Sequence, residues 1–392
     1  MATRAQDAAN RAGVISRRLS GWLDTIDRGF VAAWSDLAGH VSEPNIFGES
    51  WFLRPALEQF DISGQVKLFT LWDGEQLCGL MPLSTHQRYG RWPLPHVQNW
   101  LHHNAFLGTP LIRTGYADDF WRELFAALDN NPGQSLFLHM NGVTTGGEIA
   151  NALENQCAKQ RRNYGMVHQA ERALLENGVT PQVYYEEAVR PKKRKELRRQ
   201  KNRLAEEGVL TFARDASEAG LMEWIGEFLN LENRGWKGRN GSALASFEST
   251  RALFTEVVIG AATLGKLERL DLRLDGKPMA MLVNFISAPG CFSFKTAFDE
   301  NYARFSPGVL LQIENLALLD TPDILWCDSC AAQGHPMIDS IWTGRRSIGR
   351  YSIAIGGLGR RSVFGAFLKA ELARYASRTV TDDQEFIAGE EA

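Results

Sequence analysis

The chain has 392 residues, which is more than one typical domain holds, so its length predicts two domains. Hydrophobic residues make up 44% and charged residues 23% of the sequence, as in a soluble globular protein, and the formal net charge of −3 argues against a general nucleic-acid binder. Five cysteines, an odd number spread over a long chain, exclude a disulfide framework and are typical of a reducing compartment.

The apolar runs of the sequence bear on its location. None approaches the roughly 20 residues that a membrane-spanning helix needs. The N-terminal segment carries arginines but no apolar core after them, so the sequence does not predict a secretory signal. We therefore expect a cytoplasmic protein, with peripheral contact at the inner membrane.

In chain order, the N-terminal half alternates predicted helices and strands. Residues 1–20 are polar and rich in alanine and arginine, which favours a frayed chain or a loose helix. Apolar residues at helical spacing predict helices, and β-branched or aromatic runs predict strands. The elements predicted after residue 20 are helices over 27–39 and 51–60, strands over 66–72 and 76–83, a helix over 120–128, a strand over 135–140, a helix over 147–160 and a strand over 164–175.

The second half repeats this order. Loop residues near 176–192 mark a boundary, so we predict an N-terminal lobe over 1–180 and a C-terminal lobe over 181–392. The elements predicted there are helices over 190–203 and 248–263, strands over 267–274, 278–286 and 291–298, an apolar helix from 306 and a buried strand over 324–330. The hairpin turns Asp73-Gly74 and Asp275-Gly276 align without gaps, which indicates two copies of one α/β unit.

The predicted helix over 190–203 is strongly basic. It contains nine basic residues and one acid, with Leu197 and Leu204 as its apolar anchors. Two interpretations stay open: a solvated surface helix, or a surface for an anionic partner such as a phosphorylated cofactor, an acyl carrier or an acidic lipid. It has no interleaved aromatic residue to stack on bases, so we do not expect nucleic acid as a partner.

Two further patterns have several interpretations. Residues 91–107 mix tryptophans with His96, His102 and His103, for which core packing is favoured over a lipid-binding groove or a zinc site. Cys327 and Cys330 have CxxC spacing, for which buried thiols are favoured over a metal or redox pair.

The segment 298–316 is the most informative stretch of the chain. An aromatic strand ends at Phe298, and Ser306-Pro307-Gly308 opens an apolar helix. Serine is a good N-cap, and proline is tolerated in the first turn of a helix. Gly308 leaves the helix mouth without a side chain, so an anion can approach the free N–H groups. The pattern therefore predicts a helix N-terminus that binds phosphate.

Polar residues follow the predicted buried strand that ends near Asp328. His335 comes after it in a loop, and a carboxylate–imidazole pair can take a proton from an attacking group near neutral pH. The alternative is that Asp328 caps a turn and His335 is an ordinary loop residue. The segment 232–239 is expected to end a helix at Gly235 or Gly238 and to continue as an ordered loop over a site.

These segments together resemble the GNAT acyltransferase superfamily, in the two-lobed branch that includes the Fem-type aminoacyltransferases and the CelD-like acetyltransferases. The motifs that carry the resemblance are Trp34-x-x-Leu37 with residues 44–47 and Trp51, the basic segment from Lys195 to Gly208, and above all Asp299-x-x-Tyr302-Ala303-x-x-Ser306-Pro307-Gly308-x-Leu310-Leu311. The resemblance implies an α/β (α+β) fold of tandem GNAT-like lobes, each a mixed twisted sheet flanked by helices. This chain lacks the Gly and Tyr-Lys pair that often follow the strand-end Asp in that branch, which indicates a specialised acceptor side.

The resemblance also implies an activity: an N-acyltransferase that moves an acyl group from acyl-CoA, or from an acyl carrier protein, directly to an amine. The amine is expected in a lipid or envelope precursor such as a sphingoid base; acyl-CoA is a co-substrate, and neither a tightly bound cofactor nor a metal is expected. The implied roles are His335 as base with Asp328 orienting it, Ser306, Pro307, Gly308, Val309 and Lys295 on the donor, and Tyr302, Trp236, Arg345 and Asp339 on the substrates. Two alternatives stay open, a Fem-like transferase that uses aminoacyl-tRNA and a non-catalytic module that binds an acyl carrier or a lipid.

Overall fold

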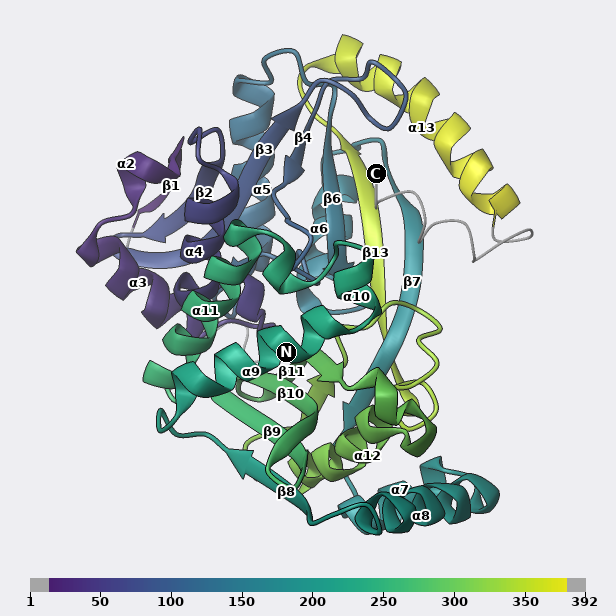
Figure 1. Ribbon diagram of the computed structural model, residues 1–392. Helices are drawn as coiled ribbons and strands as arrows, with labels where there is room; N and C mark the ends of the chain where they lie inside the picture. The colour runs from purple at the N-terminus through teal and green to yellow at the C-terminus, as the bar shows by residue number, and fades with distance from the viewer. Residues whose placement is uncertain (1–13, 379–392) are drawn as a thin grey trace. The chain divides into compact units, whose positions relative to one another are not determined.

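Residues 14–378, described by the computed structural model, divide into two units (Figure 1). One unit takes residues 14–48, 63–170 and 347–378, and the other takes 49–62 and 171–346. This division differs from the predicted one at 180/181, because the chain returns to the first unit after residue 346. The lobe boundaries themselves stay a prediction.

The first unit is a mixed sheet with helices around it. Its strands, in sheet order, are β1 (Ile15–Gly21), β2 (Lys67–Asp73), β3 (Gln76–His86), β4 (His96–Asn99), β6 (Phe137–Thr144), β13 (Gly344–Ala354) and β7 (Tyr164–Glu176), with β5 (Leu111–Ile112) against β3. β4 and β6 are parallel, whereas β1–β2, β2–β3, β3–β4 and β6–β13 are antiparallel. By the bounds of the two units, β7 and β13 each contribute residues to both.

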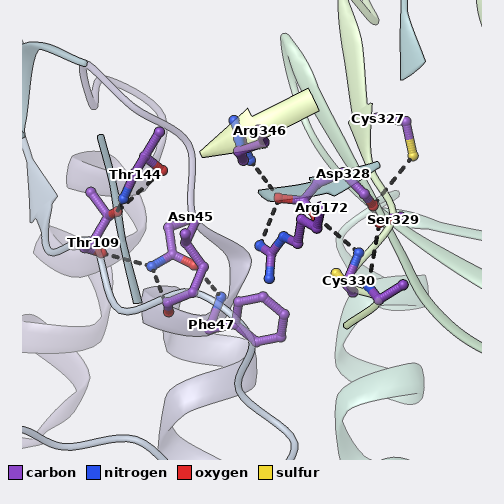
Figure 2. A network of polar contacts seen from close by, with 12 residues as sticks. Asn45, Phe47, Thr109, Thr144, Arg172, Cys327, Asp328, Ser329, Cys330 and Arg346 are labelled. Carbon is purple, nitrogen blue, oxygen red and sulfur yellow. Dashed lines mark hydrogen bonds and ion pairs between the residues drawn. The ribbon is translucent and has the colours of Figure 1, made fainter. Parts of the chain in front are cut away.

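The helices of the first unit bury apolar stripes. They are α2 (Trp22–Thr25), α3 (Arg28–Ala38), the 3-10 turn η1 (Ile46–Gly48), α5 (Ala117–Asn130), α6 (Glu148–Lys159) and α13 (Leu358–Arg378). On α5, Phe120 and Trp121 are fully buried, and the ring of Phe120 lies 5.2 Å from that of Phe69 on β2. Asn45 fastens the loop before η1 by donating to the carbonyls of Leu107 and Thr109 (Figure 2).

The N-terminal prediction is wrong for the residues that the structure describes. Residues 15–21, expected as frayed chain or loose helix, form strand β1 and pair with β2 along their whole length. Pairing with a strand some 50 residues away overrides the weak local preference of the segment. Residues 1–13 lie outside the described part of the chain.

The second unit is another mixed sheet. Its strands, in sheet order, are β7, β12 (Trp326–Asp328), β11 (Gly290–Phe298), β10 (Lys277–Ser287), β9 (Leu267–Leu274) and β8 (Leu210–Asp215). β11 and β12 are parallel and the other neighbours antiparallel. Its helices are α4 (Ser50–Phe60), α7 (Pro181–Ala188), α8 (Pro191–Ala205), α9 (Leu221–Arg234), α10 (Trp236–Arg239), α11 (Glu248–Thr263) and α12 (Pro307–Glu314), with 3-10 turns η2 (Leu244–Ser246), η3 (Glu300–Phe305) and η4 (Asn315–Asp320). The predicted class, mixed sheets flanked by helices, is confirmed.

The two hairpins that suggested an internal repeat close with different turns. Gly74 and Glu75 connect β2 to β3, with φ 59° at Gly74, whereas Asp275 and Gly276 connect β9 to β10, with φ 47° and 78°. The second pattern is that of a type I′ turn, which needs positive φ at both central residues, and the first has it at one. The aligned Asp-Gly pairs therefore lie one residue out of step in the two hairpins.

The segment 91–107 adds a histidine to the core of the first unit. The ring of His96, on β4, stacks on Phe137 with centroids 5.0 Å apart, and the buried His139 lies with Nδ1 3.0 Å from Oγ of Ser352. Within residues 14–378 no group of histidine, cysteine or acidic side chains is placed to hold a metal ion, and no helix there is long and apolar enough to cross a membrane. The favoured interpretation, core packing, fits His96.

Acid should weaken the first unit through His139. Burial, and then the nearby His96, lower the pKa of His139 to about 3, so below pH 6.5 the unfolded chain binds a proton that the folded unit does not. The free energy of unfolding should therefore decrease by about 2 kcal/mol from pH 7 to pH 5, at about 1.4 kcal/mol per pH unit below 6.5. Urea unfolding at both pH values measures this loss. His139→Gln should reduce the pH dependence and the exposed His40→Gln should not; equal slopes in all three proteins would contradict it.

Candidate functional site

Strand β11 has an edge that β12 leaves uncovered. β12 pairs with β11 only from Gly290 to Phe292, whereas β10 pairs with its other side as far as Phe298. Within residues 14–378, no strand lies against the β12 side of β11 between Ser293 and Phe298. The backbone groups of such an edge can pair with an extended ligand. The chain then runs through η3 to the start of α12.

The N-terminus of α12 is not capped by its serine. Ser306 stands at the N-cap position, but its backbone is left-handed, with φ 54° and ψ 49°, and its side chain makes no cap hydrogen bond. The prediction that Ser306 caps the helix is therefore wrong. Because Pro307 has no N–H, the first-turn donors that an intrahelical bond cannot satisfy are those of Gly308 and Val309.

Gly308 is covered rather than open. A Cβ atom at this position would lie 3.0 Å from Sδ of Met337 and 3.3 Å from the ring of Phe298. The prediction that Gly308 leaves an open helix mouth is wrong in this respect, since Met337 occupies that space. Methionine is flexible and unbranched, so it is a side chain that can move from a helix mouth when a ligand arrives.

Lys295 lies on the uncovered stretch of β11. Its side chain is half-buried, and burial, together with the cation of Lys237, lowers the pKa of Lys295 to about 8. Lys237 is itself held by the buried Glu232, whose Oε1 lies 2.8 Å from its Nζ. The other oxygen of Glu232 accepts the N–H of Leu244 at 2.8 Å. A buried carboxylate thus fixes one cation close to a second.

His335 lies in the loop that follows β12. Burial lowers its pKa, Lys237 lowers it further, and Asp339 opposes them by raising it. Its Nδ1 is buried and has no hydrogen-bond partner in the part of the chain that the structure describes. Because Lys237 acts on the pKa of both Lys295 and His335, the fold gathers the open strand and the loop around one cation.

Asp328 serves a different purpose from the predicted one. Its Oδ2 accepts from Arg172 at 2.7 Å and from Arg346 at 2.8 Å, and its Oδ1 accepts the N–H of Cys330 at 2.9 Å (Figure 2). Although burial raises the pKa of Asp328, the two guanidinium groups hold it below its usual range. Among the described residues no hydrogen bond joins Asp328 to His335, so the predicted carboxylate–imidazole pair is not formed.

The remaining predicted residues separate into two places. Arg345 donates to the carbonyl of Trp342 at 2.7 Å and lies 4.0 Å from Asp339, so these two belong to the His335 loop. Trp236 opens helix α10, where an ordered loop was expected, and its N–H donates to Glu300 at 2.6 Å. Tyr302 is half-buried on η3 beside α12.

Sequence reasoning missed three residues at this site: Glu232, Lys237 and Met337. Glu232 and Lys237 are five residues apart at the end of α9, and the signal was an acid on the buried side of an apolar helix. Met337 carries no sequence signal, because its role arises from a contact with Gly308 across the fold.

The CxxC pair is an ordinary pair of buried thiols. Cys327 and Cys330 are both buried, and burial raises the pKa of each thiol. A raised pKa leaves little thiolate at neutral pH, which is the form that reacts or binds metal. The favoured interpretation of this motif therefore fits the structure.

Comparisons with known proteins bear on the same segment. Residues 191–321 match a family model described as acetyltransferase (GNAT) domain, a range that holds α8, Lys237, β11 and α12. The structure of FemX is similar over 82% of this chain and 95% of its own, with 8% identity and a TM-score of 0.53. A conserved protein of unknown function from Bacteroides thetaiotaomicron VPI-5482 is similar over 87% and 100%, with 14% identity and a TM-score of 0.51. A search of curated proteins found no match. The chain thus contains a GNAT acetyltransferase domain over residues 191–321, and its fold is that of FemX, as the resemblance implied.

Proposed function

We propose that the protein is an N-acyltransferase that moves an acyl group from acyl-CoA to an amine. The observation that carries this proposal is the uncovered edge of β11, which leads to the uncapped N-terminus of α12 inside the GNAT match. The amides of a pantetheine arm can pair with the backbone between Ser293 and Phe298. The first-turn N–H groups of Gly308 and Val309 suit the negative charge of its phosphates.

The reaction is a direct attack on the thioester. The amine nitrogen forms a bond to the thioester carbonyl carbon, the C–S bond then breaks, and the thiol leaves with a proton. An amine arrives as an ammonium ion at neutral pH, so a base must first remove its proton. His335 suits this role, because its lowered pKa keeps the imidazole neutral at pH 7 and its Nδ1 is unoccupied within the described chain.

Lys295 supplies positive charge on the donor side. With a pKa of about 8, about nine-tenths of its side chains are charged at pH 7. A cation on the open strand can stabilise the oxyanion that forms on the thioester carbonyl, or protonate the departing sulfur. Asp339, which acts electrostatically on His335, offers the opposite charge to an ammonium acceptor.

The acceptor that we propose is a lipid amine of the sphingoid-base kind. Two large apolar side chains beside Lys237 in the sequence are exposed: Trp236 at 49% and Phe247 at 62%. Exposed aromatic rings can lie against an alkyl chain whose amine end reaches His335. This choice rests on fewer contacts than the donor side does.

Release of free CoA tests the proposed function. The purified protein should bind CoA in calorimetry and release it from a long-chain acyl-CoA when a sphingoid base is added, more than with a short alkylamine. Failure of both binding and release with every amine would contradict the proposal and favour a non-catalytic module. Turnover with aminoacyl-tRNA in place of acyl-CoA would instead support the Fem-type alternative.

Replacing Lys295 should remove the alkaline limb of the pH profile. Since the charged form is the useful one, wild-type kcat should decline as pH rises through about 8, and Lys295→Gln should lower kcat about 10²-fold at pH 7 and abolish that decline. Lys295→Arg, which keeps the charge, should retain more activity without the limb. The exposed Lys277→Gln is the matched control. A Lys295→Gln profile with the wild-type limb would refute the role.

A further inference from the structure

Helix α8 presents a line of cations to solvent. Lys192, Lys195, Arg199 and Arg203 recur at spacings of three and four residues, so they lie along one side of the helix over about 16 Å. All four are exposed. The opposite side is fastened to the core by Leu197 and Leu204, which are fully buried. The charged side is therefore fixed outward by the fold.

Acidic residues do not neutralise this side. Lys201, on the flank of α8, pairs with Glu314 at 3.2 Å, and nearby Arg304 pairs with Glu207 at 2.6 Å. Lys192, Lys195 and Arg199 form no ion pair within residues 14–378. A protein with a net charge of −3 thus carries an uncompensated basic stripe on one helix.

The stripe reaches the proposed donor site. Arg199 and Arg203 line a hollow of about 350 Å³ together with Arg304 and Phe305. Phe305 immediately precedes Ser306, where α12 begins. The basic side and the mouth of α12 therefore belong to one continuous region of the second unit.

Small apolar side chains flank the stripe. Helix α7 ends two residues before Arg190 and exposes Val183 at 40%, and Val179 before it is 39% exposed. Burial raises the pKa of Tyr185 on α7, while Arg194 and Arg198 lower it, which shows that the two helices are close. Cations and exposed valines thus share one part of the surface.

We propose that this part of α8 and α7 docks the protein on an anionic lipid surface. Clusters of four to eight Lys or Arg on a helix bind anionic lipids at about 1 kcal/mol per residue, and small apolar groups favour the interfacial region. Nucleic acid suits the site less, because α8 has no aromatic side chain on which a base could stack. An acidic protein suits it less because the stripe is a single convex helix, not a groove.

Docking goes beyond the proposed function, since it requires no acyl transfer. Its consequence does rest on that function: the region next to the α12 mouth would face the bilayer, where a lipid amine resides. Binding should weaken as salt rises, because exposed charges are screened.

Vesicle sedimentation tests the docking surface with the full chain. The protein should bind phosphatidylcholine vesicles that contain phosphatidylglycerol and should not bind pure phosphatidylcholine. The triple variant Lys192→Gln/Lys195→Gln/Arg198→Gln spares the hollow and should bind about 10²-fold more weakly, at about fivefold for each cation removed. The matched control Lys67→Gln/Lys277→Gln/Lys369→Gln removes the same charge from exposed lysines elsewhere and should bind like the wild type.

Four results would overturn the proposal: no binding to anionic vesicles at low salt, equal binding to both vesicle types, unchanged binding of the triple variant, or displacement of vesicles by an RNA oligonucleotide that the triple variant no longer binds. Turnover with a detergent-dispersed amine separates this proposal from the proposed function. If the triple variant loses vesicles but keeps that turnover, docking is supported on its own. If the wild type binds vesicles but releases no CoA, docking stands and the proposed function fails.

Discussion

Replacement of Asp328 by asparagine should lower the free energy of unfolding of the second unit by about 3–5 kcal/mol. The side chain is fully buried and pairs with Arg172 and Arg346, whose side chains are 9% and 13% exposed. Asparagine keeps the shape but removes the charge, so two buried guanidinium groups would be left without a counter-ion. Breaking one side of a buried ion pair costs much more than a surface pair is worth.

Urea unfolding followed by tryptophan fluorescence measures this loss, since Trp326 and the fully buried Trp342 belong to the same unit. The control is Asp323→Asn, an exposed acid five residues earlier, which should stay within about 0.5 kcal/mol of the wild type. A stable Asp328→Asn protein with lost turnover would return Asp328 to the chemistry and contradict a structural role.

The pH dependence gives a second check on Asp328. The two arginines hold its folded pKa below its usual range, so its contribution is present above the unfolded pKa of about 3.9 and is lost as pH falls through the folded value. The difference between wild type and Asp328→Asn should therefore be full at pH 7 and shrink below about pH 4.

Local chemistry explains which elements the sequence predicted. Helices α3 and α4 carry Phe30, Trp34 and Trp51 at helical spacing, so their apolar sides could be read without a partner. Strands β1 and β13 and helix α13 were missed because their formation depends on pairing or packing with distant segments. β13, for example, joins the sheet by pairing with β6, some 200 residues earlier in the chain.

The candidate site divides in the same way. The junction of β11 and α12 was found because Ser306-Pro307-Gly308 is a contiguous pattern. The partner of Asp328 was not found, because Arg172 lies 156 positions away. The positive φ of Ser306 depends on the tertiary course of the chain around η3 and likewise has no sequence signal.

Replacement of His335 by alanine or glutamine should lower kcat by 10²–10⁴-fold while donor binding stays within a fewfold of the wild type, since a general base contributes about that much. Burial lowers the pKa of His335, so wild-type kcat should rise with pH through a value below 6.5 and be level at pH 7. Steady-state rates of CoA release and calorimetry with CoA measure the two quantities. The exposed His40→Gln is the control. Loss of CoA binding in the His335 variants would refute the assigned role.

A change at Lys237 can distinguish a base from a merely structural histidine. Lys237 lowers the pKa of His335, and Lys237→Gln removes that cation while a side-chain amide remains to donate to Glu232. The acid limb of kcat should therefore move to higher pH in Lys237→Gln. A histidine that only supports the loop would produce no such shift, because its protonation would not set the rate. An unmoved limb, with the variant folded and active, would mean that the base of the reaction is a group other than His335.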